Sequence, residues 1–537
     1  MAEIAVGRVI SGMREVSRDA LIERAACAAT GLSELGVGAG DAIGVVLRND
    51  FAFFEASYAA QRLGAYSVPV NWHGKTQEIA YVLKDCGAKA VVAHADLLPK
   101  VGPAMPPEVP LFVVPTPPEI AAAYRIAEEL CAPPADALVW DDLVTCFPPL
   151  PEAPAGVISS MIYTSGTTGN PKGVLRLDMG PAVAQLFAAM VRDVFGIAPD
   201  RVVRTVITGP LYHSAPNAYG LYAVRMGGLA VLQPRFAAEE LLRLIEQYSI
   251  THLHMVPTMF VRLLRLPEEV KRRYDLSSLE WVVHGAAPCP ADVKRAMIEW
   301  WGPVIYEYYG ATETGIATFH TSEEALRKPG TVGRPTPGGT VRIYGADGRV
   351  LPAGEVGEIY LWLEGFPDFT YYGQDEKRRE VGRDGLVTLG DVGYLDGDGY
   401  LFICDRARDM VISGGVNIYP AEIEAALLAM PGVGDCAVFG IPDEEYGEKL
   451  CAHIEPDSSA RLDAAEVKAF LCGRLADFKV PRVIAFEATP AARGFRQDHE
   501  TQAARALLGQ CGTPHLICRR WKGCARPFTI FSRFVPA

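Results

Sequence analysis

The chain has 537 residues, a formal net charge of −13 and a hydrophobic content of 49%. This length exceeds what one hydrophobic core supports, so we expect one large domain and at least one smaller domain. The hydrophobic content indicates a folded globular protein, and the acidic balance argues against a nucleic-acid partner.

The twelve cysteines include no Cys-x-x-Cys pair. This spacing indicates reduced thiols and argues against both a disulfide framework and a zinc site. The first ten residues contain an early acid and no long apolar core, so no signal peptide is expected. No uncharged apolar run reaches the length of a membrane span, so no transmembrane segment is expected. Together these features predict a cytoplasmic α/β enzyme.

Short β-branched runs alternate with helical patterns through the first 300 residues. Strands are expected at AIGVVL from Ala42, AKAVVAH from Ala88, PLFVVP from Pro110, RTVITG from Arg204, LAVLQP from Leu229, THLHMV from Thr251 and LEWVVHG from Leu279. Between them, the run AAEELLRLIEQYS places Leu241, Leu244 and Ile245 on one helical face. This alternation predicts βαβ units with mostly parallel sheets covered by helices. The proline-rich segments 102–118 and 133–154 are expected to be surface connections.

The pattern changes twice in the second half of the chain. From Gly333 onward, short strands with Gly-Asp turns indicate a small β-rich subdomain. After Asp409 a compact α+β pattern follows, with helices expected from Pro420 and over residues 467–475. The expected segments are residues 1–407 as a large N-terminal domain, 408–490 as a small C-terminal domain and 491–537 as an aberrant tail.

A glycine-rich and hydroxyl-rich run occupies residues 161–174, which read MIYTSGTTGNPKGV. Glycines let backbone amides approach an anion, hydroxyls add donors and Lys172 supplies a cation, so this run predicts a polyphosphate site. It is not a Walker A loop, because Pro171 precedes the lysine and Gly173 follows it. A flexible linker is the alternative, but linkers seldom follow a strand of buried type.

This run closely resembles the signature of the adenylate-forming, or AMP-binding, superfamily, which includes acyl-CoA synthetases. Three further segments match that family in the same order: YYGATE at 308–313, the acid Asp391 in TLGDVGYLDGDGY, and DRARD at 405–409 followed by SGGVNIYPAEIE. The resemblance extends to about Glu487. It implies an α/β fold in which a large N-terminal domain carries a small, mobile α+β C-terminal domain.

The resemblance also implies a reaction in two halves that uses ATP, Mg²⁺ and coenzyme A. A carboxylate attacks the α-phosphorus of ATP, and a thiol then attacks the acyl adenylate. Thr164 and Glu313 would place Mg²⁺, and Arg408 would be the hinge of the small domain. The nucleotide-binding residues implied are Thr164, Ser165, Gly166, Thr167, Thr168, Gly169, Lys172, Gly285, Ala286, Ala287, Pro288, Glu307, Tyr308, Tyr309, Gly310, Thr312, Glu313, Asp391 and Arg406, and those implied near the pantetheine are Gly414, Gly415 and Asn417.

The run PLYHSAPNAYG at 210–220 resembles the segment that lines the acyl pocket of the family. His213, Asn217 and Gly310 are therefore candidate substrate residues, although a packed core histidine is an open alternative for His213. His252 and His254 alternate on one expected strand and suggest a metal pair, but no third ligand lies nearby in the sequence, so strand packing is favoured.

The predicted function is an ATP-dependent carboxylate–CoA ligase for a hydrophobic acyl or aryl acid, a small-molecule substrate. Two alternatives remain open. One is an adenylation enzyme that loads a carrier-protein thiol, and the other is a nucleotide-binding or acyl-adenylate-binding protein that is inactive in adenylation. The resemblance is compatible with a homodimer.

The second alternative arises because one lysine of the family is missing. The family carries it near the C-terminus in a motif like Ser-Gly-Lys-Ile-x-Lys-Arg, whereas this chain reads PAARGFRQDHETQ at that place. Read one base later, the codons for residues 495–502 can spell S-G-K-I-M-K-R-K. The sequence therefore supports the hypothesis of a one-base frameshift near residues 489–491, with a divergent tail as the rival explanation. Adenylation by the chain as written is predicted to be impaired.

Overall fold

The computed structural model describes residues 7–151, 160–164, 171–176, 181–198, 201–406, 409–413, 416–443, 446–457 and 461–486. The chain divides into two compact units between Arg408 and Asp409. The tail expected from residue 491 onward lies outside the described residues. Among the described helices, none combines the length and apolar character that a membrane span requires.

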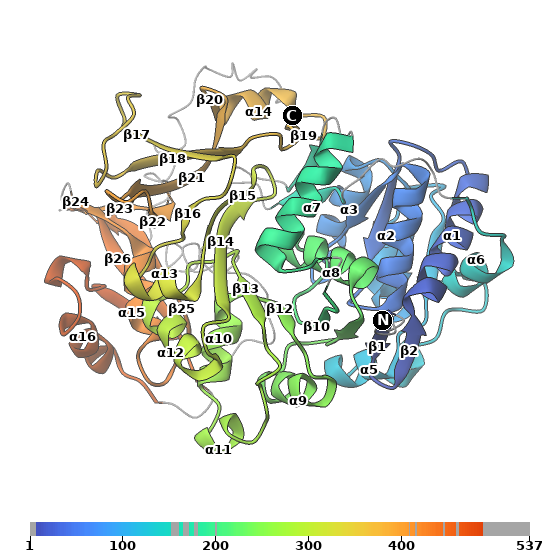
Figure 1. The fold of residues 1–537 in the computed structure, drawn as a ribbon, viewed down its shortest axis with the longest axis horizontal. Helices are drawn as coiled ribbons and strands as arrows, with labels where there is room; N and C mark the ends of the chain where they lie inside the picture. Colours follow the sequence, from blue (N-terminus) through green and yellow to red (C-terminus); the bar gives the residue numbers. More distant parts are fainter. Residues whose placement is uncertain are drawn as a thin grey trace, which may run out of the picture. The chain divides into compact units, whose positions relative to one another are not determined.

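The first sheet is fully parallel and has helices on both faces (Figure 1). Its strands, in spatial order, are β4 (Tyr66–Pro69), β3 (Ala42–Val46), β5 (Ala88–His94), β6 (Leu111–Val114) and β7 (Leu138–Val139). One face packs against α1 (Arg18–Glu34), α2 (Phe51–Leu63) and α6 (Trp140–Cys146), and the other against α3 (Thr76–Asp85) and α4 (Leu98–Val101). Because crossover helices cover both faces, the strands are mainly apolar, as βαβ patterning predicts.

The second sheet has nine strands and a parallel centre. Its strands, in order, are β16 (Arg334–Pro335), β15 (Gly315–His320), β14 (Ile305–Ala311), β13 (Trp281–His284), β12 (His252–Met255), β10 (Arg204–Ile207), β11 (Leu229–Leu232), β1 (Arg8–Ser11) and β2 (Arg14–Ser17). On one face lie α7 (Pro181–Phe195) and α8 (Ser214–Met226), which Figure 1 shows between this sheet and the N-terminal elements. The other face is covered by α9 (Ala238–Tyr248), α10 (Pro257–Leu264) and α12 (Ala291–Trp301).

Two antiparallel sheets complete the large unit. The β-rich subdomain contains β17 (Gly339–Tyr344), β18 (Gly357–Leu363), β20 (Gly382–Arg383), β21 (Leu386–Leu395) and β22 (Leu401–Arg406). A three-stranded sheet, in the order β19 (Phe369–Tyr371), β9 (Lys172–Arg176), β8 (Ile162–Thr164), carries both ends of the expected phosphate loop. The remaining helices of this unit are α5 (Pro118–Tyr124), α11 (Glu268–Lys271), α13 (Ser322–Arg327) and α14 (Asp375–Glu380). The predicted α/β fold with parallel sheets and a β-rich subdomain is confirmed.

The small unit has an α+β fold. Its strands are β23 (Val411–Ser413), β24 (Val416–Ile418), β25 (Val433–Asp443), β26 (Gly447–Pro456) and β27 (Val483–Phe486). Their apolar side chains pack with those of α15 (Pro420–Leu428) and α16 (Ala464–Cys472). The last helix differs from the predicted range 467–475. It begins earlier because the Asp463 side chain accepts bonds from the amides of Ala465 and Glu466, and it ends before Gly473.

The segment 133–154 was wrongly expected to be only a surface connection. It contains β7 and α6, and Trp140 is fully buried. The indole Nε1 of Trp140 donates a hydrogen bond of 2.8 Å to the buried carboxylate of Glu55 on α2. A buried aromatic ring with a satisfied polar atom thus anchors a proline-rich stretch to the core.

His252 and His254 on β12 are structural residues. His252 Nδ1 lies 2.8 Å from Thr251 Oγ1, and its Nε2 lies 3.1 Å from the carbonyl oxygen of Gly196. His254 Nε2 lies 2.9 Å from the hydroxyl of Tyr308. Among the described residues, no group of three or more His, Cys, Asp or Glu side chains could hold a metal ion. These contacts agree with strand packing, the reading that the sequence favoured.

The buried His254 predicts a loss of stability in acid. Burial lowers its pKa from 6.5 to about 4. The unfolded chain therefore binds a proton that the folded chain excludes as the pH falls from 6.5 toward 4, and this difference destabilises the fold by about 2 kcal/mol between pH 7 and pH 5. We expect His254→Gln to lose less stability than the parent chain between these pH values, measured by urea denaturation.

Between pH 8 and pH 9 His254 is neutral in both the folded and unfolded chains. The same variant should then show no change in the pH dependence of stability over this range, which serves as the internal control. An equal loss in acid for parent and variant would contradict the assignment.

Candidate functional site

The two ends of the expected phosphate loop lie directly opposite each other. Thr164 at the end of β8 pairs with Lys172 at the start of β9. Opposite residues of an antiparallel pair project to the same face of the sheet, so the hydroxyl and the ammonium share one face. The intervening residues 165–170, which include Ser165, Gly166, Thr167, Thr168 and Gly169, lie outside the described residues.

Glu313 lies in the turn between β14 and β15, partly buried. The Tyr371 hydroxyl donates a hydrogen bond of 3.2 Å to its Oε1. Burial raises the pKa of the carboxyl group, and the opposing influences are its own backbone amide, Arg176, Tyr371 and Lys172. The carboxylate is therefore held in an environment that favours the approach of a cation.

Lys172 is a cation whose charge acts on the Glu313 carboxylate. Its ammonium lies 4.8 Å from the centroid of the Tyr371 ring, within the range of a cation–π contact. Burial lowers the pKa of Lys172, as does the neighbouring Lys377, while Glu380 and Glu313 raise it. Tyr371 therefore touches both charged groups, because its ring faces the lysine and its hydroxyl bonds the glutamate.

The adenine slot implied by the sequence lies at the ends of β13 and β14. Gly285 is buried, and a Cβ atom added there would lie 2.8 Å from Cζ of Tyr308, so glycine permits this close approach. Ala286 has a left-handed φ of 68°, an uncommon conformation for a residue with a side chain. Ala286, Ala287 and Pro288 are exposed. The surface of the slot is thus built by exposed backbone above a buried tyrosine.

The two tyrosines of the slot face different partners. Tyr308 is buried, and its hydroxyl bonds His254 in the core. Tyr309 donates a hydrogen bond of 2.6 Å to Oδ2 of Asp391. Burial and the carboxylate of Asp391 raise the pKa of Tyr309 well above its ordinary value, so the hydroxyl stays protonated as a donor. At Gly310 an added Cβ atom would collide with the carbonyl oxygen of Gly315.

Asp391 and Arg406 are neighbours across two paired strands. Asp391 on β21 lies opposite Arg406 on β22, and Arg406 Nε is 3.6 Å from Asp391 Oδ1. With Tyr309 on its other oxygen, the carboxylate is bounded on two sides. Three residues that the sequence implied for the nucleotide therefore meet at one place, brought there by β14, β21 and β22.

Glu307 belongs to a buried ion-pair cluster below the slot. Its Oε2 bonds the ammonium of Lys294 and, at 2.8 Å, Nε2 of His320. Burial raises the pKa of Glu307, but Lys294, His284 and His320 outweigh this effect, so the pKa falls well below its ordinary value and the carboxylate stays ionised. Glu307 thus supports β14 from the core side, and Thr312 lies partly buried in the turn that follows the same strand.

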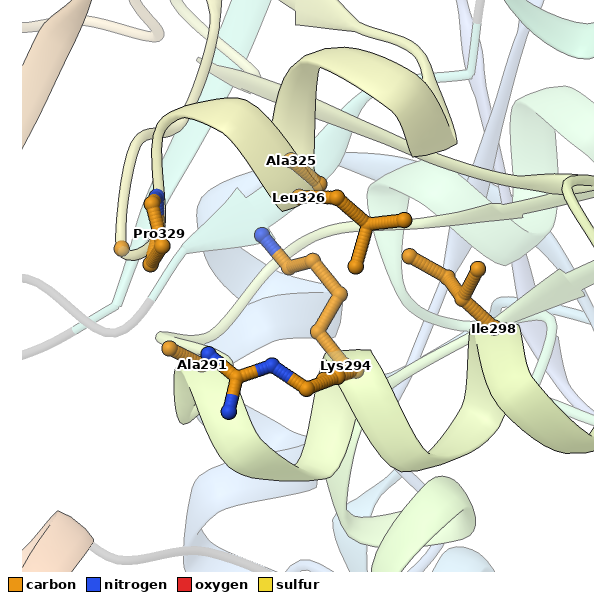
Figure 2. Close-up of a pocket in the computed structure, with 8 residues that line it drawn as sticks. Ala291, Lys294, Ile298, Ala325, Leu326 and Pro329 are labelled. Carbon is orange, nitrogen blue, oxygen red and sulfur yellow. The ribbon is translucent and has the colours of Figure 1, made fainter.

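Lys294 also lines a small surface pocket, which Figure 2 shows beside α12 and α13. Its side chain runs from α12 toward the segment that carries Ala325 and Leu326. The ammonium donates to Glu307 and to the carbonyl oxygen of Thr331 and lies 3.1 Å from Nε2 of His320. Because these contacts occupy its donors, the pocket presents mainly the apolar stem of Lys294.

The candidate substrate residues differ in their surroundings. His213 precedes α8 and lies 4.4 Å, centroid to centroid, from the ring of Tyr212, which packs against Trp72. Burial lowers the pKa of His213 to about 4, so the imidazole is neutral near pH 7. Asn217 is buried, and its Nδ2 donates to the carbonyl oxygen of Leu211. Asn217 therefore stabilises the start of α8 from within.

The candidate residues at the hinge and in the small unit remain predictions. Arg408, Gly414 and Gly415 lie outside the described residues, and of Asn417 only the backbone, in β24, is described.

The oxygen ligands available in the large unit suit Mg²⁺, because the Glu313 carboxylate and the Thr164 hydroxyl are hard donors. The lysine beside them suits a phosphate.

Comparison with known proteins identifies the family. The sequence profile of the AMP-binding enzyme family matches residues 4–365, and that of the AMP-binding enzyme C-terminal domain matches residues 422–493. The chain belongs to the AMP-binding enzyme family. The resemblance predicted from the sequence motifs is therefore confirmed.

Three known proteins show the range of this similarity. A feruloyl-CoA synthase from Amycolatopsis sp. is 34% identical over 475 residues, which cover 87% of this chain and 89% of the relative. The long-chain-fatty-acid–CoA ligase FadD13 from Mycobacterium tuberculosis is 31% identical over 464 residues, 86% of this chain and 87% of the relative. The solved structure of the amide bond synthetase McbA from Marinactinospora thermotolerans superposes with a TM-score of 0.75 at 25% identity, covering 91% of this chain and 95% of that one.

The two sequence relatives are acid–CoA ligases, a class of AMP-binding enzymes that uses ATP and coenzyme A. Two residues near the charged groups of this AMP-binding enzyme were not anticipated from its sequence. Tyr371 and Arg176 both contact Glu313, one at its side chain and one at its backbone. The available signal was weak: an arginine ends the strand that follows the phosphate loop, and two tyrosines stand before a Gly-Gln-Asp turn.

The bond between Tyr309 and Asp391 predicts a specific loss in nucleotide binding. In Tyr309→Phe, Asp391 loses a donor that orients it, and a hydrogen bond to a charged group contributes roughly 1.5 kcal/mol or more. We therefore expect the dissociation constant for AMP to rise about tenfold, measured by titration calorimetry.

Tyr308→Phe is the matched control, since that hydroxyl bonds His254 in the core. It should lower the unfolding free energy and leave AMP affinity within about twofold. Equal effects of the two substitutions on AMP affinity would refute the assignment of Tyr309 and Asp391.

Proposed function

We propose that this AMP-binding enzyme is a carboxylate–CoA ligase that forms an acyl adenylate from ATP and a hydrophobic acyl or aryl acid and transfers the acyl group to coenzyme A. The observation that carries the proposal is the arrangement around Tyr371, which contacts both the Glu313 carboxylate and the Lys172 ammonium. A carboxylate that suits a divalent cation thus contacts the hydroxyl of Tyr371, and an ammonium that suits a phosphate contacts the ring of the same residue. This pairing suits a nucleoside triphosphate bound with its metal.

In the first half-reaction, an oxygen of the acid's carboxylate forms a bond to the α-phosphorus. The bond from that phosphorus to the bridging oxygen breaks, and pyrophosphate leaves with the electron pair. Lys172 would hold the polyphosphate, and Thr164 and Glu313 would hold Mg²⁺. When bound, this ion withdraws negative charge from the phosphate oxygens. Tyr309, Asp391 and Arg406 would fix the nucleoside, so that positioning lowers the barrier.

In the second half-reaction, the thiol sulfur forms a bond to the acyl carbon. The bond from that carbon to the phosphate oxygen breaks, AMP leaves with the electron pair, and the thiol proton passes to water. We assign Arg408 to the hinge and Gly414, Gly415 and Asn417 to the approach of the pantetheine. A rotation of the small unit about residue 408 would let one site serve both halves.

The hydrophobic substrate class is supported by the surroundings of His213. Its ring packs on Tyr212, whose ring meets Trp72 at 6.3 Å, centroid to centroid. A neutral imidazole among aromatic rings suits an apolar or aromatic acid better than a second charged group. The names of the relatives, a feruloyl-CoA synthase and a long-chain-fatty-acid ligase, point in the same direction.

The cellular setting is proposed from the sequence. The cysteine pattern suits the cytoplasm, and a homodimer stays a prediction of the resemblance. The tail from residue 491 is proposed to be out of frame, because its codons read one base later can spell the lysine motif of the family.

The choice of acid and acceptor is tested on the frame-corrected chain. We expect pyrophosphate release with ferulate-like or fatty acids and an acyl-CoA product detected by mass spectrometry. Small polar acids should give a kcat/KM lower by at least about tenfold, because they gain less from contact with the aromatic side chains around His213.

Carrier protein and a free amine serve as competing acceptors in the same assay. The amine is included because an amide bond synthetase shares the fold. Preference for either acceptor over coenzyme A would contradict the CoA ligase proposal while leaving adenylation intact.

The missing lysine predicts unequal damage to the two half-reactions. The chain as written should show ATP–pyrophosphate exchange at least about a hundredfold slower than the frame-corrected chain, because a cation near the α-phosphate stabilises charge in the transition state. Thioester formation from supplied acyl adenylate should fall less.

Circular dichroism and AMP binding of the two chains provide the control for folding. Equal loss of both half-reactions would indicate a misfolded small unit. The nucleotide sequence around codons 489–502 tests the frameshift itself, since its next frame must spell the lysine motif.

A further inference from the structure

Arg176 is a buried cation at the end of β9. It is 8% exposed, and burial lowers its pKa to about 10. Its Nη1 donates to the carbonyl oxygen of Glu313 at 2.8 Å and to that of Pro367 at 3.3 Å. Its guanidinium carbon lies 4.3 Å from the centroid of the Phe366 ring. One side chain therefore ties together the turn of residue 313 and the loop at 365–368.

Among the described residues Arg176 forms no ion pair within 4 Å, and the charges of Glu313 and Asp368 act on it only from a greater distance. Burying a guanidinium that contacts carbonyl groups and a ring, with its nearest carboxylates beyond ion-pair distance, is costly, and an apolar side chain of similar size would fill the space with less penalty. Packing alone therefore does not explain an arginine here.

The contact of Arg176 with the backbone of Glu313 explains why an arginine occupies this position. Pleating turns Lys172, Val174 and Arg176 to the same face of β9. At one end of this face Lys172 meets the ring of Tyr371, and at the other Arg176 holds the carbonyl of Glu313 from below. The Glu313 carboxylate is then fixed at two points, by the Tyr371 hydroxyl at its side chain and by Arg176 at its main chain.

We propose that Arg176 is a positioning residue for the metal-binding carboxylate of Glu313. The proposal rests on the function assigned above, in which Glu313 holds Mg²⁺. Arg176 touches neither nucleotide nor metal. It fixes the turn so that the carboxylate points to one place, and its removal should weaken the contribution of Mg²⁺ to ATP binding and leave metal-free binding unchanged.

The test measures ATP binding by the full chain with Mg²⁺ and with EDTA, by titration calorimetry. The dissociation constant in EDTA divided by that with Mg²⁺ reports the contribution of the metal to ATP binding. This ratio is measured without turnover. In Arg176→Met this ratio should fall at least about fivefold, because a small displacement of a ligand group costs much of its effect. Arg176→Lys keeps the charge but lacks the planar fork, and it should lie between parent and Met.

Arg204→Met is the matched control. Arg204 also donates to a main-chain carbonyl, that of Ser249 at 2.7 Å, but on β10. It should leave the ratio unchanged. Thermal melting shows whether each variant is folded. A fall in the ratio for a folded Arg176→Lys variant then indicates a loss of positioning and not a loss of folding.

An equal loss of ATP affinity with and without Mg²⁺ in Arg176→Met would overturn the proposal, and so would an unchanged ratio. A parent chain that shows no contribution of Mg²⁺ to ATP binding would overturn it too. A parent chain that binds Mg²⁺ with ATP yet forms no acyl-CoA after frame correction would refute the ligase function alone, because the ratio is measured without catalysis.

Discussion

The register of the three-stranded sheet β19–β9–β8 is the constraint on which the candidate site depends. Thr164 lies opposite Lys172, and Tyr371 lies opposite Val174. Because side chains alternate along a strand, this register turns Thr164, Lys172, Arg176 and Tyr371 to one face. A slip of any one of these strands by one residue would turn its side chains to the face opposite the others. Backbone pairing therefore places these side chains on one face, and this placement does not depend on any single contact between them.

Two glutamates near the end of β14 show how surroundings divide the roles of similar residues. Glu307 bonds Lys294 and His320 inside the core, and its pKa is lowered. Among the described residues, the Glu313 carboxylate accepts one side-chain hydrogen bond, from the Tyr371 hydroxyl, and burial raises its pKa. The first is already neutralised by protein groups, whereas the second gains most from an added cation. The two glutamates are only six residues apart in the chain. The ionisation of each and its capacity to bind a cation therefore follow from the groups that surround it.

Local pattern was enough to predict much of this architecture. The strands from Ala42, Ala88 and Thr251 follow from apolar runs, and Lys172 and Glu313 follow from motifs whose residues are adjacent in the chain. Contacts between distant segments could not be read in this way. Arg176 reaches a backbone oxygen 137 residues away, and Trp140 bonds a carboxylate 85 residues away. In each case the partner is chosen by strand order and helix packing, which composition and periodicity do not specify.

The candidate nucleotide-binding residues of the large unit find their partners within that unit. Tyr309 bonds Asp391, Arg406 lies beside the same carboxylate, and Arg176 holds the turn of Glu313, all with partners before residue 409. Apart from positioning the nucleotide, binding energy of this kind is expressed in both the ground state and the transition state, so it adds little to the rate of the chemical step. A lysine near the α-phosphorus acts differently, because the charge it meets develops only during the reaction. We therefore propose that nucleotide affinity and adenylation rate are separable, the first set by the candidate residues of the large unit and the second by the lysine motif that the frame-corrected tail would supply.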